Sequence, residues 1–174
     1  MGCGKSSVGR KLSSLLSCSW GDVDHEIEAE SGRTVSELFA EEGEAAFRER
    51  ETAALARLIA EKTRIISLGG GTPTIAACQE LIREKTTCIW LKASPETLTE
   101  HMRRSWRKRP LLKDMPDPET AAEAWKAAMV ERISELLKKR ESDYAAVARF
   151  TLDINGLGTD EVVAAIIRLL NEKL

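Results

Sequence analysis

The chain of 174 residues has no long hydrophobic run, no CxxC cysteine pair and no strong excess of charge of one sign. None of its apolar runs approaches the roughly 20 residues that a membrane-spanning helix needs, and the N-terminal MGCGKSS lacks the apolar core of a secretory signal. The formal net charge is −2, so no global field attracts the protein to nucleic acid or to a membrane. We expect a cytoplasmic monomer that binds neither.

Four cysteines are present, and none has the spacing of a zinc-binding pair. Without a secretory signal, we expect them to be reduced thiols. The length suits one domain with a substantial core, and 43% hydrophobic and 31% charged residues are ordinary for a globular protein. We therefore expect a single domain over residues 1–174, with no internal repeat.

Short apolar runs alternate with helical patterns, which predicts an α/β fold. Val8, Leu12, Leu15 and Leu16 recur at helical spacing, so a helix is expected after Lys5. Further helices are expected over 24–31, 34–41, 43–62, 75–84 and 119–140, and from 94 and 159 onward. Thr34 with Glu37 predicts a capping box at the start of the helix over 34–41. Strands are expected over 18–22, 64–68, 87–92 and 149–154. The stretch 103–118 is basic and then proline-rich, a composition typical of a mobile segment.

The N-terminal segment ends like a phosphate-binding loop of the form GxxxxGK[ST], since Gly4, Lys5 and Ser6 match its last three positions. Glycines let backbone N–H groups surround phosphate oxygens, and the following helix directs its N-terminus at the anion. Lys5 is expected to contact the β- and γ-phosphates of ATP, and the Ser6 hydroxyl to bind Mg²⁺. A chance GKS sequence near a chain end is the alternative.

The first glycine of this motif, and the strand that normally precedes it, would lie before Met1. Such a strand lies inside a parallel sheet that is buried on both faces. Its absence would leave unpaired backbone groups that cost about 1–3 kcal/mol each. Our hypothesis is that the natural chain starts upstream and that Met1 is an internal methionine, which the upstream coding DNA would test.

Six motifs in order resemble the shikimate kinase family along essentially the whole chain: MGCGKSSVGRKL, DVDHEIE, FAEEGEAAFRERE, GGG, RPLL and the stretch from Arg140 to Tyr144. The resemblance implies a three-layer P-loop kinase fold with a central parallel sheet. It also implies a substrate-binding region at about 24–62 and a lid at about 103–118. The implied reaction is the ATP- and Mg²⁺-dependent phosphorylation of shikimate to shikimate 3-phosphate, in aromatic amino-acid (chorismate) biosynthesis.

On the nucleotide side, the resemblance implies that Asp22 lies near the magnesium together with Ser6, and that Arg109 reaches into the closed site from the lid. The nucleotide-binding residues that it implies are Gly2, Cys3, Gly4, Lys5, Ser6, Ser7 and Arg109. Lys5 and Arg109 would neutralise charge during phosphoryl transfer, which depends mainly on positioning and electrostatics.

On the substrate side, Asp24 is implied to bind the shikimate hydroxyls and to accept the reacting proton. Arg48 and Arg140 match arginines that hold the shikimate carboxylate, a group that a planar guanidinium binds with two hydrogen bonds. Glu51 matches an acid that steadies Arg48. The loop of Gly69, Gly70 and Gly71 would lie against the substrate, since glycines permit a close approach.

Each motif alone has a simpler interpretation. Asp22 and Asp24 can be helix caps, Arg48 can be a solvated helical charge in an i,i+4 pair, and the three glycines can form a plain turn. Arg109 can belong to a solvated basic run or a weak nucleic-acid patch.

Two departures from the family pattern concern single residues. The usual proline near the tyrosine is absent from the stretch 140–144, and no adenine-binding arginine is evident near the last strand. Two other functions stay open. One is a related small-molecule kinase, such as a gluconate or nucleotide kinase. The other is a non-catalytic binding protein of the same fold.

Overall fold

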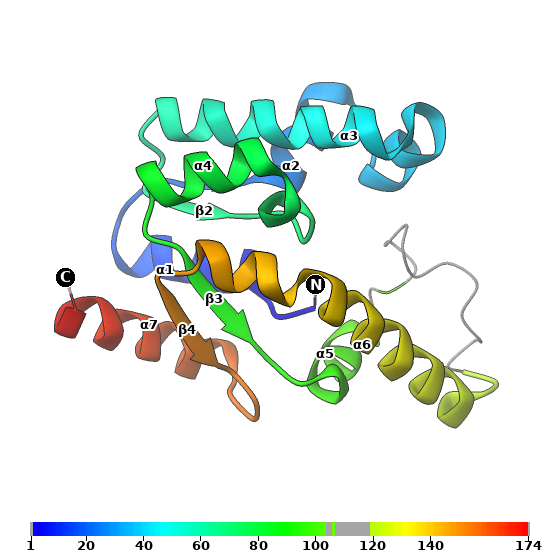
Figure 1. Cartoon of the computed structure of the whole chain (residues 1–174). Helices are drawn as coiled ribbons and strands as arrows, with labels where there is room; N and C mark the ends of the chain where they lie inside the picture. The colour runs from blue at the N-terminus through cyan, green and yellow to red at the C-terminus, as the bar shows by residue number, and fades with distance from the viewer. Residues whose placement is uncertain (1, 104–105, 107–118, 174) are drawn as a thin grey trace.

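The computed structural model describes residues 2–103, 106 and 119–173 (Figure 1). Its helices are α1 (Lys5–Leu15), α2 (Val23–Ser31), α3 (Val35–Ala60), α4 (Ala76–Lys85), α5 (Pro95–Met102), α6 (Ala122–Val147) and α7 (Thr159–Lys173), with a short 3-10 helix η1 (Thr72–Thr74). Its strands are β1 (Trp20–Asp22), β2 (Ile65–Ser67), β3 (Ile89–Lys92) and β4 (Phe150–Asp153). Each helix and strand expected from the sequence is present. The largest difference is α6, which continues to Val147 instead of ending at 140.

The strands are parallel, as the resemblance implied, and they form two separate pairs. β1 pairs with β2, and β3 pairs with β4. Among the described residues, Gly2 to Gly4 lead into α1 without a preceding strand, and no strand joins the two pairs. The register places Asp22 opposite Ser67, so polar side chains at the carboxyl ends of β1 and β2 lie side by side.

Two hydrophobic clusters fill the interior. One contains buried side chains of α1, α5, α6 and α7, with β3 and β4 packed against it. The other contains those of α2, α3 and α4, together with Val147 at the end of α6. In Figure 1, α3 and α4 form the upper part and β3, β4 and α7 the lower part. Successive residues of β2 serve both clusters, because Ile65 packs on the first and Ile66 on the second. α1 touches β1, β2 and α7, so the helix after the phosphate loop lies between the two parts.

The expected helix after Lys5 is confirmed, but its last apolar residues do not face the core. Val8 and Leu12 are buried, whereas Leu15, the last residue of α1, and Leu16 are exposed. No helix of the described part of the chain is long and apolar enough to cross a bilayer.

The helices expected over 34–41 and 43–62 join in α3, with a sharp bend at Gly43. This residue has φ 82° and ψ 173°, a conformation that side chains exclude. The expected capping box is confirmed, since Thr34 and Glu37 bond to each other's backbone N–H.

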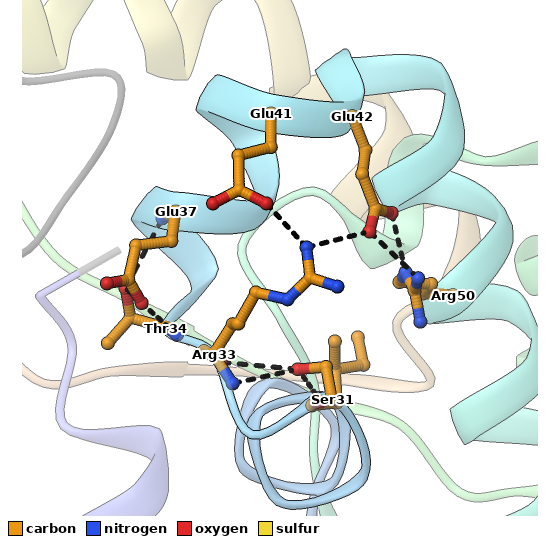
Figure 2. A network of polar contacts seen from close by, with 8 residues as sticks. Ser31, Arg33, Thr34, Glu37, Glu41, Glu42 and Arg50 are labelled. Carbon is orange, nitrogen blue, oxygen red and sulfur yellow. Dashed lines mark hydrogen bonds and ion pairs between the residues drawn. The ribbon is translucent and has the colours of Figure 1, made fainter.

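A network of charges spans this bend (Figure 2). Arg33 Nη1 lies 2.5 Å from Glu41 Oε2 and 3.5 Å from Glu42 Oε1. On the far side of the bend, Arg50 donates two hydrogen bonds to Glu42, at 2.9 and 3.0 Å. The network therefore ties the short first segment of α3 to the long second segment.

Gly43→Ala should destabilise the fold by about 1–3 kcal/mol, because alanine is strained at this φ and ψ. Urea denaturation of the two proteins measures the loss. Gly158→Ala is the matched control, since Gly158 has no positive φ and a Cβ there would meet only Glu161, at 3.4 Å. Equal stabilities of the two variants would contradict the assignment of strain to Gly43.

Candidate functional site

The loop before α1 has the backbone geometry that phosphate binding needs. Gly2 and Gly4 adopt φ 75° and 76°, in the left-handed region. The first hydrogen bond of α1 runs from the Val8 N–H to the Gly4 carbonyl, so the earlier N–H groups of the helix point out of its N-terminus. A Cβ at Gly4 would meet no atom within 4 Å, so the loop opens to space at this point. These features fit an anion at the end of α1.

α5 supports the loop from behind. A Cβ at Gly2 would lie 2.9 Å from Met102 Cγ and 3.0 Å from the Leu98 carbonyl oxygen. The His101 Nδ1 lies 3.0 Å from the Gly2 carbonyl oxygen. Glycine is therefore needed at position 2 for packing as well as for its positive φ.

A relay of hydrogen bonds holds the other side of the loop. Trp20 Nε1 donates to Ser67 Oγ at 3.0 Å, and Ser67 Oγ donates to the Lys5 carbonyl at 3.2 Å. A Cβ at Gly9 would lie 2.6 Å from both Trp20 Nε1 and Ser67 Oγ, so α1 packs closely on these strands. The sequence interpretation missed Trp20 and Ser67. The available signal was a serine inside the apolar run RIISL, directly before the glycines.

Two oxygen groups meet beside the N-terminus of α1. Ser6 Oγ donates to Asp22 Oδ2 at 2.5 Å. The other oxygen of this buried carboxylate accepts from the N–H groups of Asp24 and His25, at 3.1 and 3.3 Å. The helix-cap interpretation of Asp22 is therefore correct, and it leaves Oδ2 facing the loop.

This pair of ligand groups suits Mg²⁺, which prefers oxygen ligands and usually binds one or two carboxylates together with substrate phosphates. Among the described residues, no group of three or more His, Cys, Asp and Glu side chains is placed to hold a metal by itself. A metal bound by Ser6 and Asp22 would therefore depend on phosphate oxygens for the rest of its coordination.

Cys3 is a buried thiol within the loop, with its Sγ 3.9 Å from Lys5 Nζ. Burial acts to raise its pKa, but the nearby Lys5 charge and backbone N–H groups outweigh burial and lower the pKa below its usual value. The same positive environment favours phosphate oxygens at this place.

The glycine loop after β2 lies against the carboxylates predicted for the substrate side. A Cβ at Gly69 would lie 2.8 Å from Asp24 Oδ1 and 2.5 Å from Glu51 Oε1. No side chain fits between them. The loop thus brings the start of α2 and the middle of α3 together, so these residues form more than a plain turn.

Arg48 is held rigidly at the same loop. Its guanidinium makes an ion pair with the buried Glu51 and another, of 2.6 Å, with the exposed Glu44. It lies 5.7 Å from the Phe39 ring, and a Cβ at Gly71 would overlap it. The i,i+4 pair with Glu44 confirms one sequence interpretation, but the Arg48 side chain is only 18% exposed and is not a solvated charge.

Burial acts to lower the pKa of Arg48, while hydrogen bonds and charge from Glu51 and Glu44 outweigh burial and raise this pKa. Arg48 is therefore a fixed positive group next to the glycine loop.

Arg140 and Tyr144 reach the loop from α6. Arg140 Nη1 donates to the Gly70 carbonyl at 3.3 Å, and the Tyr144 hydroxyl donates to the same oxygen at 2.7 Å. From the sequence, Tyr144 was only the end of a motif, and the structure shows that its hydroxyl fixes the glycine loop. The absence of the usual proline does not displace Arg140 from the site.

The site residues predicted from the sequence therefore lie along one path, from the phosphate loop through Asp22 and Asp24 to the glycine loop, Arg48 and Arg140. Arg109 and most of the expected lid lie outside the described residues. A phosphate loop beside a hydroxyl–carboxylate pair is how P-loop kinases hold a nucleotide, and the chain is a kinase of this class.

Comparisons with known proteins identify the family. The sequence profile of the shikimate kinase family matches residues 1–171. The chain is 41% identical over 143 residues to a shikimate kinase of Chlorobaculum parvum, covering 82% of this chain and 74% of that one. It is 36% identical over 174 residues to a shikimate kinase of Symbiobacterium thermophilum, covering 99% and 93%.

Solved structures agree. Shikimate kinase from Acinetobacter baumannii in complex with shikimate matches with a TM-score of 0.86 and 32% identity, covering 100% of this chain and 90% of that one. Shikimate kinase from Bacteroides thetaiotaomicron matches with a TM-score of 0.83 and 29% identity, covering 98% and 94%. The chain belongs to the shikimate kinase family.

Glu51→Ala should lower the free energy of unfolding by about 3–5 kcal/mol, because Arg48 loses the carboxylate that is buried beside it. Glu44→Ala is a matched control, since Glu44 pairs with the same guanidinium but is 60% exposed, and its loss should cost about 0.2–1 kcal/mol. Chemical denaturation measures both. Similar losses would show that burial does not distinguish the two pairs.

Proposed function

We propose that this chain transfers the γ-phosphoryl group of ATP to the 3-hydroxyl of shikimate and so forms shikimate 3-phosphate and ADP. The observation that carries the proposal is that one glycine loop lies against Arg48, which Glu51 holds, at Gly71 and against Asp24 at Gly69. A fixed guanidinium and an aspartate on the same loop suit an acceptor that has both a carboxylate and a hydroxyl.

In this proposal, the phosphates of the nucleotide bind at the N-terminus of α1. The positive φ of Gly2 and Gly4 turns the loop around the phosphates, and Lys5 carries the positive charge near them. Ser6 and Asp22 would hold Mg²⁺, which when bound neutralises charge on the phosphate oxygens. Cys3 and Ser7 complete the loop and the first turn.

The acceptor lies against Gly69, Gly70 and Gly71, where side chains would block its approach. Arg48 binds its carboxylate with two donors, and Arg140 supplies a second positive group from α6. Arg140 already bonds to the Gly70 carbonyl, so it reaches this loop without a large rearrangement. The related gluconate and nucleotide kinases would not require both arginines with this loop.

In the transfer step, the acceptor oxygen attacks the γ-phosphorus, the bond from this phosphorus to the β–γ bridging oxygen breaks, and ADP leaves. The hydroxyl proton passes to the Asp24 carboxylate, which also orients the hydroxyl. The resemblance assigns Arg109 the neutralisation of charge from the lid, which excludes water. The single domain, the monomeric state and the cytoplasmic location stay predictions.

The test is ADP release from MgATP, measured with shikimate, gluconate, a nucleoside monophosphate or no acceptor. We expect release only with shikimate. Release driven by another acceptor would support a related small-molecule kinase instead. Tight binding of shikimate without any release would support a non-catalytic binding protein.

Asp24→Asn should reduce turnover by about 100-fold while ATP binding stays near normal, because the amide cannot accept the proton. Steady-state kinetics and nucleotide titration measure the two effects. Asp160→Asn is the control, since Asp160 lies in an exposed pair with Lys11. Near-normal turnover of Asp24→Asn would remove Asp24 from this role.

Arg48→Ala should weaken shikimate binding by about 2–5 kcal/mol and leave ATP binding nearly unchanged, because the substrate carboxylate loses its partner. Arg50→Ala is the control, since this arginine lies on the same helix but pairs with Glu42. Calorimetric titration with each ligand measures the affinities. Equal losses for shikimate and ATP would indicate a general structural defect.

A further inference from the structure

Thr72 is a completely buried threonine next to the glycine loop, with 0% of its surface exposed. It begins the short helix η1, directly after Gly71. Its Oγ1 donates a hydrogen bond of 2.6 Å to Glu51 Oε1, on α3. No sequence motif singled out this residue.

The two oxygens of Glu51 have separate partners. Oε1 accepts from Thr72, and Oε2 accepts from Arg48 Nη1. Glu51 is 1% exposed, so water does not replace either donor. The rotation of the carboxylate is therefore set by Thr72 on one side and by Arg48 on the other.

The bond differs from the intrahelical backbone bonds that Thr52 and Thr99 make. Thr52 donates to the Arg48 carbonyl and Thr99 to the Pro95 carbonyl, each four residues earlier in its own helix. Such bonds stay within one helix. Thr72 instead bonds to a side chain 21 residues earlier, which belongs to the group that holds Arg48.

Thr72 also lies at the substrate side of the loop. A Cβ at Gly69 would be 2.8 Å from Thr72 Oγ1, 2.8 Å from Asp24 Oδ1 and 2.5 Å from Glu51 Oε1. The hydroxyl thus shares one point of close packing with Asp24 and Glu51, the residues expected to act on the acceptor and on Arg48.

We propose that Thr72 is a positioning residue for the acceptor carboxylate: through Glu51 it fixes the orientation in which Arg48 offers its two donors. The inference rests on the proposed function for the identity of the ligand. It predicts that loss of the hydroxyl weakens the binding of shikimate. The affinity for MgATP, which binds on the far side of Asp22, should not change.

The experiment uses the full chain and compares Thr72→Val, which keeps the shape but removes the donor, with Thr72→Ser, which keeps the donor. Calorimetry measures the dissociation constants for shikimate and MgATP, and steady-state kinetics measures KM and kcat. Thr72→Val should raise the dissociation constant and KM for shikimate roughly tenfold, because a buried carboxylate oxygen loses its neutral donor. The dissociation constant for MgATP should stay within about twofold.

Two variants separate positioning from general stability. Thr72→Ser should restore shikimate affinity, since the hydroxyl returns. Thr99→Val removes an equally buried hydroxyl that bonds only to its own helix, and it should leave shikimate affinity unchanged. The inference is overturned if Thr72→Val binds shikimate like the unchanged protein, or if it loses affinity for both ligands equally.

If the unchanged protein binds no shikimate, the proposed function fails, and thermal unfolding then decides the inference separately. Thr72→Val, Arg48→Ala and the double variant are compared. A loss of Tm in the double variant that is smaller than the sum of the single losses supports the link from Thr72 through Glu51 to Arg48. Additive losses overturn it.

Discussion

The buried carboxylate of Glu51 sets the arrangement of the substrate side. A charged group with 1% exposure is stable in a protein interior only if hydrogen bonds and an opposite charge replace water. Arg48 supplies the charge and Thr72 a neutral donor, from two different elements. α3 must therefore lie directly against the loop after β2. That closeness in turn leaves no room for side chains at positions 69 and 71.

Asp22 has a similar position on the nucleotide side. One oxygen caps α2 and the other bonds to Ser6, so a single carboxylate connects the start of α2 with the first turn of α1. Asp24 is the second residue of α2, so the orientation of this expected proton acceptor depends on the same cap. The proposed nucleotide and acceptor sites are thus joined through two neighbouring aspartates, Asp22 and Asp24.

Local patterns predicted most of the fold and many site residues. The break between the helices at 34–41 and 43–62 is the bend at Gly43, and the Thr34 capping box follows from residues three apart. The roles of Trp20, Ser67 and Thr72 were not predictable in this way, because each depends on contacts across 47, 62 or 21 residues of sequence. Their side chains carry no local signal of function. Leu15 and Leu16 contributed to the correct prediction of α1, but the helical period did not show that both side chains are exposed.

The separation of the strands into two pairs has a consequence for how the molecule opens. The β3–β4 pair packs mainly with the first hydrophobic cluster, whereas β2 contributes to both, and among the described elements α1, α6 and the two faces of β2 connect the clusters. Proteins open in contiguous cooperative units that follow such divisions. We expect amide exchange to divide the chain into two such units, with protection in α3 and α4 lost together and protection in β3, β4 and α7 lost at a different free energy. A ligand that spans Ser6 and Arg48 would join these units and merge their exchange.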